Sequence, residues 1–135
     1  MPHVTVDWLI NQHTVCRKMT VFRLISLPFH GALELVIGMA TMAAPFVLGF
    51  GAAGTVIGVL VGALVVGLAL SAAVAETGTI DIAAHYAYDV GLALGLVGAG
   101  VVLAISGDTP AAVWFLSASA AQLALNLTTR YSARR

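Results

Sequence analysis

Long apolar stretches separated by short polar or glycine-rich breaks dominate this chain. No charged residue occurs between Glu34 and Glu76, and none occurs in residues 90–107 or 109–129. A helix needs ~20 apolar residues to cross ~30 Å of hydrocarbon, so the first stretch contains two crossings and each later stretch contains one. Gly, Pro and polar residues mark the breaks, which places the crossings at about 27–50, 55–75, 84–105 and 111–127. The pattern predicts an all-α integral membrane four-helix bundle.

Composition supports a membrane protein and argues against a nucleic-acid partner. Of the 135 residues, 60% are hydrophobic and 9% are charged, whereas roughly 25% are charged in an ordinary soluble domain. The formal net charge is zero, so no basic surface is expected to attract a phosphate backbone. The single cysteine, Cys16, excludes an intrachain disulfide.

The bundle is predicted to consist of two copies of one helical hairpin. A shift of 55 positions superimposes residues 30–71 on residues 85–126 without a gap, and the glycine-containing breaks of the two copies also correspond. The identical pairs are His30/His85, Ala32/Ala87, Ala44/Ala99, Val47/Val102, Leu48/Leu103, Ala63/Ala118, Leu68/Leu123, Ala69/Ala124 and Leu70/Leu125. Both copies, at about 25–75 and 80–129, enter the membrane from the same side. They are therefore parallel repeats related by a pseudo-two-fold axis along the membrane normal.

The flanking segments suggest an orientation. Lys and Arg precede the first crossing at positions 17, 18 and 23 and follow the last at positions 130, 134 and 135, whereas both turns at the opposite side contain neither residue. The positive-inside rule therefore places both termini in the cytoplasm and the protein in the cell membrane. Residues 1–23 are predicted to form a cytoplasmic or interfacial segment that includes a short amphipathic helix, and residues 130–135 are predicted to form a basic tail. Met19 is an alternative start that would remove this helix.

The predicted four-helix domain, residues 24–129, resembles the SPW repeat family of small integral membrane proteins over about residues 28–127. Residues 44–50 (APFVLGF) are similar to the Ser-Pro-Trp signature near the end of the first helix of that repeat, with Ala for Ser and Phe for Trp. Residues 58–66 (GVLVGALVV) are similar to its second helix. The second copy has Ala99-Gly100-Val101 where the signature belongs, so it departs further from the pattern. The resemblance implies a hairpin architecture and brings no catalytic residues.

Each copy opens with a histidine followed four residues later by an acid, namely His30 with Glu34 and His85 with Asp89. This spacing places both members of a pair on one helix face. Ionisable side chains at the edge of hydrocarbon are costly and often functional. Because the repeats are parallel, both pairs lie at the same depth on the cytoplasmic side, where the pseudo-two-fold axis could bring them face to face. Supporting polar residues could come from Ser71, Asp81, Gln122 and Asn126.

Several chemistries suit such a cluster. It could hold a divalent metal ion, relay protons or bind a small polar ligand, although the Glu-x-x-His spacing of di-metal bundles is absent. Two histidines could also ligate a haem, but no other feature specifies a porphyrin pocket. The simpler interpretation is that the pairs are interfacial polar groups, or that they hydrogen-bond across the repeats to fix packing.

Glycines at a spacing of four allow close approach of helix backbones in lipid. They could join the two repeats or form a homodimer. The glycines in this pattern are Gly54, Gly58, Gly62, Gly91 and Gly95.

Three functions remain open. The first and favoured hypothesis is an accessory or interaction module of the membrane, which would act as a homo-oligomer or beside a larger membrane protein. The second is a metal- or ligand-binding protein, with or without redox chemistry, that uses the paired histidines and acids. The third is a small proton-coupled transporter, which requires a water-filled cavity that reaches Glu34. No phosphate-binding loop, nucleophile elbow or zinc-protease motif occurs, so the sequence does not predict an enzyme.

Overall fold

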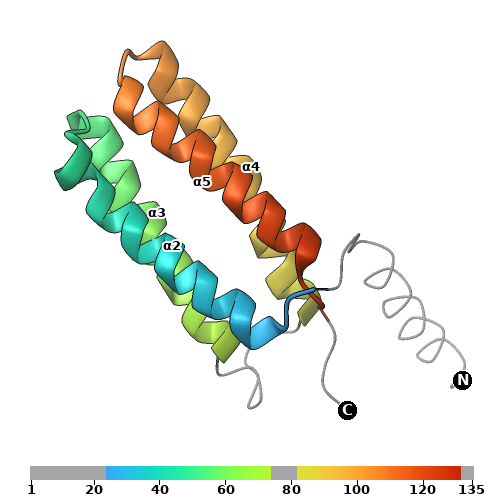
Figure 1. Cartoon of the computed structure of the whole chain (residues 1–135). Helices are drawn as coiled ribbons and strands as arrows, with labels where there is room; N and C mark the ends of the chain where they lie inside the picture. Colours follow the sequence, from blue (N-terminus) through green and yellow to red (C-terminus); the bar gives the residue numbers. More distant parts are fainter. Residues whose placement is uncertain (1–23, 74–81, 132–135) are drawn as a thin grey trace, which may run out of the picture.

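The computed structural model describes residues 24–73 and 82–131. Within them the chain forms two antiparallel helical hairpins that lie side by side (Figure 1). All four helices are long and apolar enough to span a membrane, which confirms the predicted all-α membrane bundle. The helices are α2 (Leu27–Leu48), α3 (Ala52–Ala73), α4 (Ile82–Ile105) and α5 (Thr109–Thr128). The predicted N-terminal amphipathic helix lies outside the described residues.

Local sequence signals account for the turns that close each hairpin. Helix α2 ends at Gly49, whose φ of 68° is left-handed and whose amide donates to the carbonyl of Pro45 at 3.1 Å; glycine adopts this conformation without steric cost. Helix α5 begins after Asp108, whose carboxylate accepts a hydrogen bond from the amide of Ala111. Pro110 occupies the first turn of this helix, where its missing amide hydrogen leaves no bond unmade.

The hairpins are packed tightly within themselves and more loosely against each other. Helix α2 packs along α3 and α4 packs along α5, while the two hairpins meet chiefly through α2 and α5. Gly58 and Gly62 of α3 lie against α2, where an added Cβ would stand 2.8 Å from the Pro45 ring and 2.7 Å from the Met42 amide nitrogen, respectively. These two glycines therefore allow close contact inside the first hairpin, as small residues do in membrane bundles.

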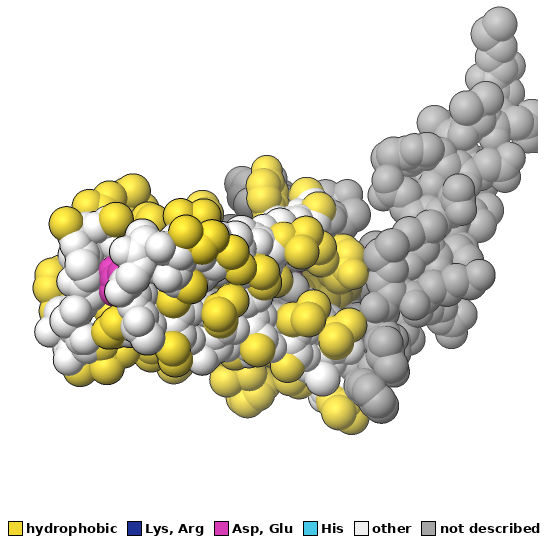
Figure 2. All heavy atoms as spheres, turned by 90° about the horizontal axis from the view of Figure 1, so that it is seen from above, with side chains coloured by type: hydrophobic (Ala, Val, Ile, Leu, Met, Phe, Trp, Pro, Cys, Tyr) yellow, Lys and Arg dark blue, Asp and Glu magenta, His cyan; other side chains and the backbone are white. Residues whose placement is uncertain are grey.

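An apolar core occupies the end of the bundle that carries the two hairpin turns. Phe115 and Leu103 are its largest buried side chains, and Phe50 packs against them. By contrast, all four helices expose large hydrophobic side chains, such as Val36, Leu60, Leu94 and Val113. Figure 2 shows hydrophobic side chains spread over one face of the bundle. Exposed hydrophobic side chains on all four helices are expected where the outer surface of a bundle contacts lipid.

Hydrogen bonds join the two hairpins at each end of the bundle. At the turn end, Asp108 accepts a hydrogen bond from the amide of Gly51 at 2.9 Å. At the other end, residues 24–25 pair with residues 128–130. The amides of Leu24 and Ile25 donate to the carbonyl of Thr128 at 2.9 and 3.1 Å, and the amide of Arg130 donates to the carbonyl of Ile25 at 2.9 Å. We call this pairing the terminal bridge.

Candidate metal centre

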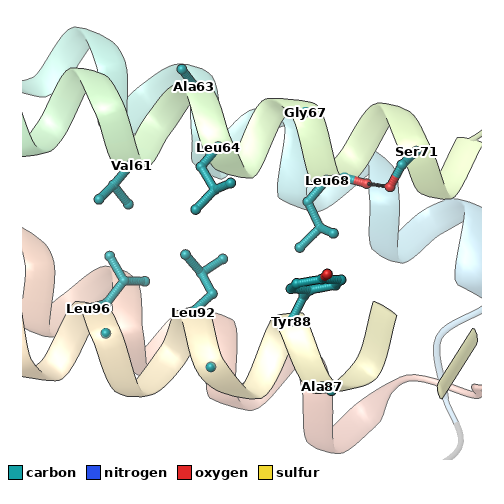
Figure 3. Close-up of a pocket in the computed structure, with 12 residues that line it drawn as sticks. Val61, Ala63, Leu64, Gly67, Leu68, Ser71, Ala87, Tyr88, Leu92 and Leu96 are labelled. Atoms are coloured by element: carbon teal, nitrogen blue, oxygen red, sulfur yellow. Dashed lines mark hydrogen bonds between the residues drawn. The ribbon is translucent and has the colours of Figure 1, made fainter. Parts of the chain in front are cut away.

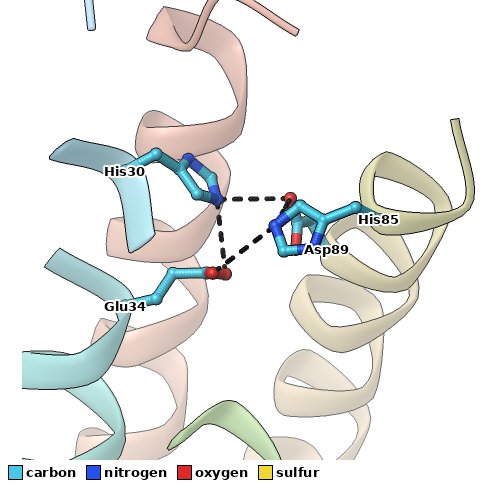
Figure 4. Close-up of side chains that lie close together, drawn as sticks. All are labelled: His30, Glu34, His85 and Asp89. Atoms are coloured by element: carbon cyan, nitrogen blue, oxygen red, sulfur yellow. Dashed lines mark ion pairs between the residues drawn. The ribbon is translucent and has the colours of Figure 1, made fainter. Parts of the chain in front are cut away.

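The two His–acid pairs meet inside the bundle near the end that carries the terminal bridge. His30 and Glu34 project from the start of α2, and His85 and Asp89 project from the start of α4 (Figure 4). The exposed fractions of the four residues are 0%, 0%, 4% and 0%, respectively. They are therefore sealed from lipid and water alike and do not extend to the membrane surface. We call these four residues the central cluster.

The donor atoms of the central cluster converge on one point. His30 Nε2 lies 3.4 Å from Glu34 Oε1 and 3.3 Å from Asp89 Oδ2. His85 Nε2 lies 3.7 Å from Glu34 Oε2 and 3.7 Å from Asp89 Oδ2. Each residue offers one ligand atom, and all four atoms lie within 4.8 Å of one another. Each imidazole therefore faces the carboxylate of the other hairpin as well as that of its own helix.

Hydrogen bonds around His30 define which of its ring nitrogens carries a proton. The hydroxyl of Thr129 donates to the carbonyl of Leu125 at 2.7 Å. Because its single proton is used there, the Thr129 oxygen accepts from Nδ1–H of His30, also at 2.7 Å. In the neutral imidazole this leaves the lone pair on Nε2, and Nε2 is the atom that faces the two carboxylates. Such an outward Nδ1 hydrogen bond is typical of histidines that bind metals.

Both carboxylates are also held by a donor from α5 or from the chain just beyond it. The side-chain amide of Gln122 donates to Glu34 Oε1 at 2.6 Å, and the phenol of Tyr131 donates to Asp89 Oδ2 at 2.6 Å. Burial raises the pKa of Tyr131, and the neighbouring Asp89 carboxylate raises it further, so the phenol remains a donor. Asn126 lies beside both donors. Its Oδ1 atom is 3.5 Å from Nε2 of Gln122 and 3.4 Å from the hydroxyl oxygen of Tyr131.

The separations within the central cluster match metal coordination better than direct hydrogen bonds. A charged N–H···O bond is about 2.7–2.9 Å long, yet the N···O separations here are 3.3–3.7 Å. Neither Nε2 atom makes a hydrogen bond, nor does Glu34 Oε2 or Asp89 Oδ1. Ligands at about 2.0–2.1 Å from a tetrahedral zinc ion are about 3.3–3.4 Å apart. A small ion at the centre would satisfy these buried atoms, and the widest pair, at up to 4.8 Å, would have to draw closer.

The supporting residues named from the sequence divide into three groups. Gln122 and Asn126 lie beside the central cluster. Ser71 does not: its hydroxyl donates to the carbonyl of Leu68 at 2.6 Å, and its side chain lines a groove between α3 and α4. Asp81 lies outside the described residues. The expected contribution of Ser71 was therefore wrong, because the part of α3 that carries it faces that groove.

The packing glycines also divide. Gly58 and Gly62 contact α2, and Gly54 lies against Asp108 and Ala111 of the second hairpin. Gly91 and Gly95, by contrast, have no atom within 4 Å of the place where a Cβ would stand. These two glycines therefore do not pack the described helices of one chain together, and the alternative that they form a homodimer stays a prediction.

Gly91 and Gly95 instead line a groove of about 800 Å³ between α3 and α4. In Figure 3, Val61, Leu64 and Leu68 of α3 face Leu92, Leu96 and Tyr88 of α4 across it. The hairpins are thus separated on this side, while α2 and α5 close the other side over the central cluster.

Sequence reasoning missed two residues of the site, Thr129 and Tyr131. Both follow the last helix, and both are almost fully buried, at 0% and 6% exposed. The Tyr131 ring stacks edge-on against the His30 ring, with centroids 5.6 Å apart. The available signal was their position, because a polar residue just after the last crossing lies at the same depth as residues just before the first.

Comparison with protein-family models, with curated proteins and with solved structures finds no match to this chain. The functional argument therefore rests on the central cluster and its surroundings.

Proposed function

We propose that this membrane protein binds one divalent metal ion between its two hairpins, with His30, Glu34, His85 and Asp89 as ligands. The observation that carries the proposal is the set of four N···O separations of 3.3–3.7 Å among fully buried side chains. Three further features support it: the Nδ1 hydrogen bond of His30 and the two donors that hold the carboxylates. Partners of this kind orient metal ligands and raise metal affinity.

Charge balance favours a divalent ion. With both imidazoles neutral, the two carboxylates give the four side chains a formal charge of −2, which is costly inside a membrane. A divalent cation reduces that charge to zero and bonds all four ligands at once. Protonation of both imidazoles would also balance the charge, but the separations of 3.3–3.7 Å are long for the hydrogen bonds that this state requires.

The ligand set indicates a first-row transition ion, with Zn²⁺ the best fit. Mg²⁺ and Ca²⁺ prefer six or more oxygen ligands, whereas two nitrogens and two oxygens in a tetrahedron suit Zn²⁺, which has no geometric preference of its own. The site holds one ion, because di-metal bundles use four carboxylates with two histidines. A haem would not fit, since carboxylates occupy the space that the porphyrin plane would need.

A Zn²⁺ ion bound by four protein ligands has no open position for a substrate, so the metal is proposed to be structural and to hold the two hairpins together. This role agrees with the accessory or interaction module favoured from the sequence, because a rigid bundle without an open active site presents its outer faces to other membrane proteins or to a second copy. The transporter hypothesis gains no support from the site, since it required a water-filled path to Glu34 and that residue is fully buried.

The cellular setting and ancestry are part of the same proposal. The Lys and Arg residues that flank the first and last crossings support a cell-membrane protein with both termini in the cytoplasm. The matched His–acid pairs at equivalent positions of the two hairpins support a tandem duplication. Residues 44–50 and 58–66 support membership of the SPW repeat family. The central cluster lies outside these two motifs.

Metal content of the detergent-purified protein tests the proposal directly. The protein is loaded with Zn²⁺, freed of excess metal and analysed by mass spectrometry, beside a His30→Ala/His85→Ala double variant. We expect one Zn²⁺ per chain in the wild type and none in the variant. Asp108→Asn is the control, because it alters a carboxylate contact at the turn end of the bundle, far from the central cluster, and should keep its metal.

Cobalt provides a second measurement that reports geometry. Tetrahedral Co²⁺ has much stronger visible absorption than octahedral Co²⁺, so a tetrahedral spectrum at one equivalent would support the ligand set. Two results would overturn the proposal. One is a trace of metal that is equal in the wild type and the double variant, and the other is an octahedral Co²⁺ spectrum that the double variant also shows. The pairs would then be protonated packing groups.

A further inference from the structure

The central cluster is much nearer to one end of the bundle than to the other. Glu34 is seven residues from the start of α2 and fourteen from its end, which corresponds to about 10 Å and about 21 Å of helix. The longer path runs through the apolar core around Leu103 and Phe115, both of which are fully buried. An ion approaching from the turn end would have to cross this core without ligands.

The sides of the bundle are closed to ions for a different reason. The helices face lipid, and the groove between α3 and α4 is lined almost wholly by apolar groups. A divalent ion would have to shed its water in hydrocarbon to approach from there, at great cost. The remaining approach is from the end of the bundle at which the described chain begins and ends.

In the part of the chain that the structure describes, residues 129–131 cover that end. Tyr131 and Thr129 lie over the cluster and bond to Asp89 and His30, respectively. Among the described residues, the backbone of this segment is joined to residues 24–25, just before α2, by the three amide-to-carbonyl hydrogen bonds of the terminal bridge. Tyr131 also stacks on Tyr86, with ring centroids 4.9 Å apart. Because this segment lies beyond the last helix, it can open locally while the four helices stay packed.

We infer that the metal enters and leaves through the terminal bridge, so that the site exchanges ions only with the aqueous compartment that holds both chain termini. The inference rests on the proposed metal function and adds its sidedness and its gate. Opening separates residues 129–131 from the start of α2 and uncovers His30 and Asp89. The opposite compartment has no route to the site.

Sidedness is measured in sealed lipid vesicles that contain the Co²⁺-loaded protein. Protease added outside removes an affinity tag at the C-terminus only from molecules whose termini face outward, which gives their fraction. A membrane-impermeant chelator is then added outside, and the loss of the Co²⁺ absorption is followed. We expect the released fraction to equal the fraction with outward termini. Release that matches the other fraction, or release from all molecules at one rate, would overturn the inference.

The gate is tested by a pair of variants at one exposed position. Leu24→Pro removes the amide hydrogen that bonds to Thr128, whereas Leu24→Ala keeps it; the Leu24 side chain is 75% exposed, so little packing changes. We expect metal association and release in detergent to be about fivefold faster in Leu24→Pro, the factor for one net hydrogen bond. The Kd should not change, because the bridge contacts the metal in neither state.

Three results are distinguishable. Faster exchange at unchanged Kd in Leu24→Pro, together with wild-type exchange in Leu24→Ala, supports the gate. Identical exchange rates in the two variants would refute it while leaving the metal site intact. If Co²⁺ does not bind the wild type at all, the proposed function itself fails and the inference fails with it.

Discussion

Replacement of Gln122 by leucine tests how the surroundings of the proposed metal site support its ligands. Gln122 is fully buried, and its side-chain amide donates to Glu34 Oε1 at 2.6 Å. Leucine has a similar volume and suits the apolar surroundings, so the helix should retain its packing. The substitution removes the donor from a carboxylate that has no contact with water.

The size of the effect follows from the role of that donor. Removal of a partner that orients a metal ligand typically weakens metal binding about 10- to 100-fold, which corresponds to about 1.4–2.8 kcal/mol. Leaving a buried carboxylate oxygen without its donor costs an amount in the same range. We therefore expect the Kd for Zn²⁺ to rise by at least about tenfold in Gln122→Leu.

The assay is a competition titration of the purified protein against a chromophoric chelator of known zinc affinity. Ser119→Ala is the matched control. Ser119 lies on the same helix one turn away, is nearly as buried, and donates to the carbonyl of Ala93 at 2.8 Å. Its loss should lower the free energy of unfolding by about 1 kcal/mol and leave the Kd unchanged.

Two outcomes would refute the reasoning. If Gln122→Leu and Ser119→Ala weaken zinc binding equally, the effect reflects general loss of packing rather than loss of a ligand partner. If Gln122→Leu remains folded and binds zinc as tightly as the wild type, the hydrogen bond from Gln122 does not support Glu34 as a metal ligand.

Three further predictions follow from the same structure. Removal of Zn²⁺ by a chelator should lower the unfolding temperature, because a ligand present at 100 times its Kd stabilises the fold by about 2.7 kcal/mol; equal temperatures with and without metal would contradict this. The pKa of Tyr131 is raised in the folded protein, so the unfolded chain loses the phenol proton at lower pH than the folded one. Stability should therefore fall as the pH rises above about 10. Thermal unfolding of Tyr131→Phe should show a weaker dependence on pH in this range. Gly62→Ala should lower stability by about 1–3 kcal/mol, since its Cβ would meet the Met42 backbone, whereas Gly95→Ala, which points into open space, should unfold at the wild-type temperature or above.

Much of the fold could be predicted because the membrane constrains it strongly. Uncharged stretches of fixed length, interrupted by glycine and proline, locate four helices within a few residues of those observed. The meeting of the two His–acid pairs could also be predicted once the repeats were recognised as parallel, because hairpins that enter from the same side place equivalent residues at equal depth. Glu34 and Asp89 illustrate this, because each lies seven residues after the first residue of its helix.

Rotation of each helix about its axis could not be predicted in the same way. Gly58 and Gly91 belong to similar small-residue patterns, but one packs against Pro45 and the other faces an open groove. Apolar side chains surround every helix here, so hydropathy does not mark an inner face. Tyr131 and Thr129 were missed for a related reason, because their burial depends on how the chain folds back over the cluster after α5.

With the proposed metal bound, the central cluster would hold the two hairpins together in a medium that provides little force for their association. Hydrophobic association does not operate between helices in lipid, so packing and polar contacts must hold them together. Between the hairpins the packing is sparse: α3 and α4 are separated by a groove, and contact is chiefly through α2 and α5. Each hairpin contributes one imidazole and one carboxylate to the cluster, so neither can complete a four-ligand site alone. The free energy of metal binding would therefore act on hairpin association, at the end of the bundle opposite to the Asp108–Gly51 fastening.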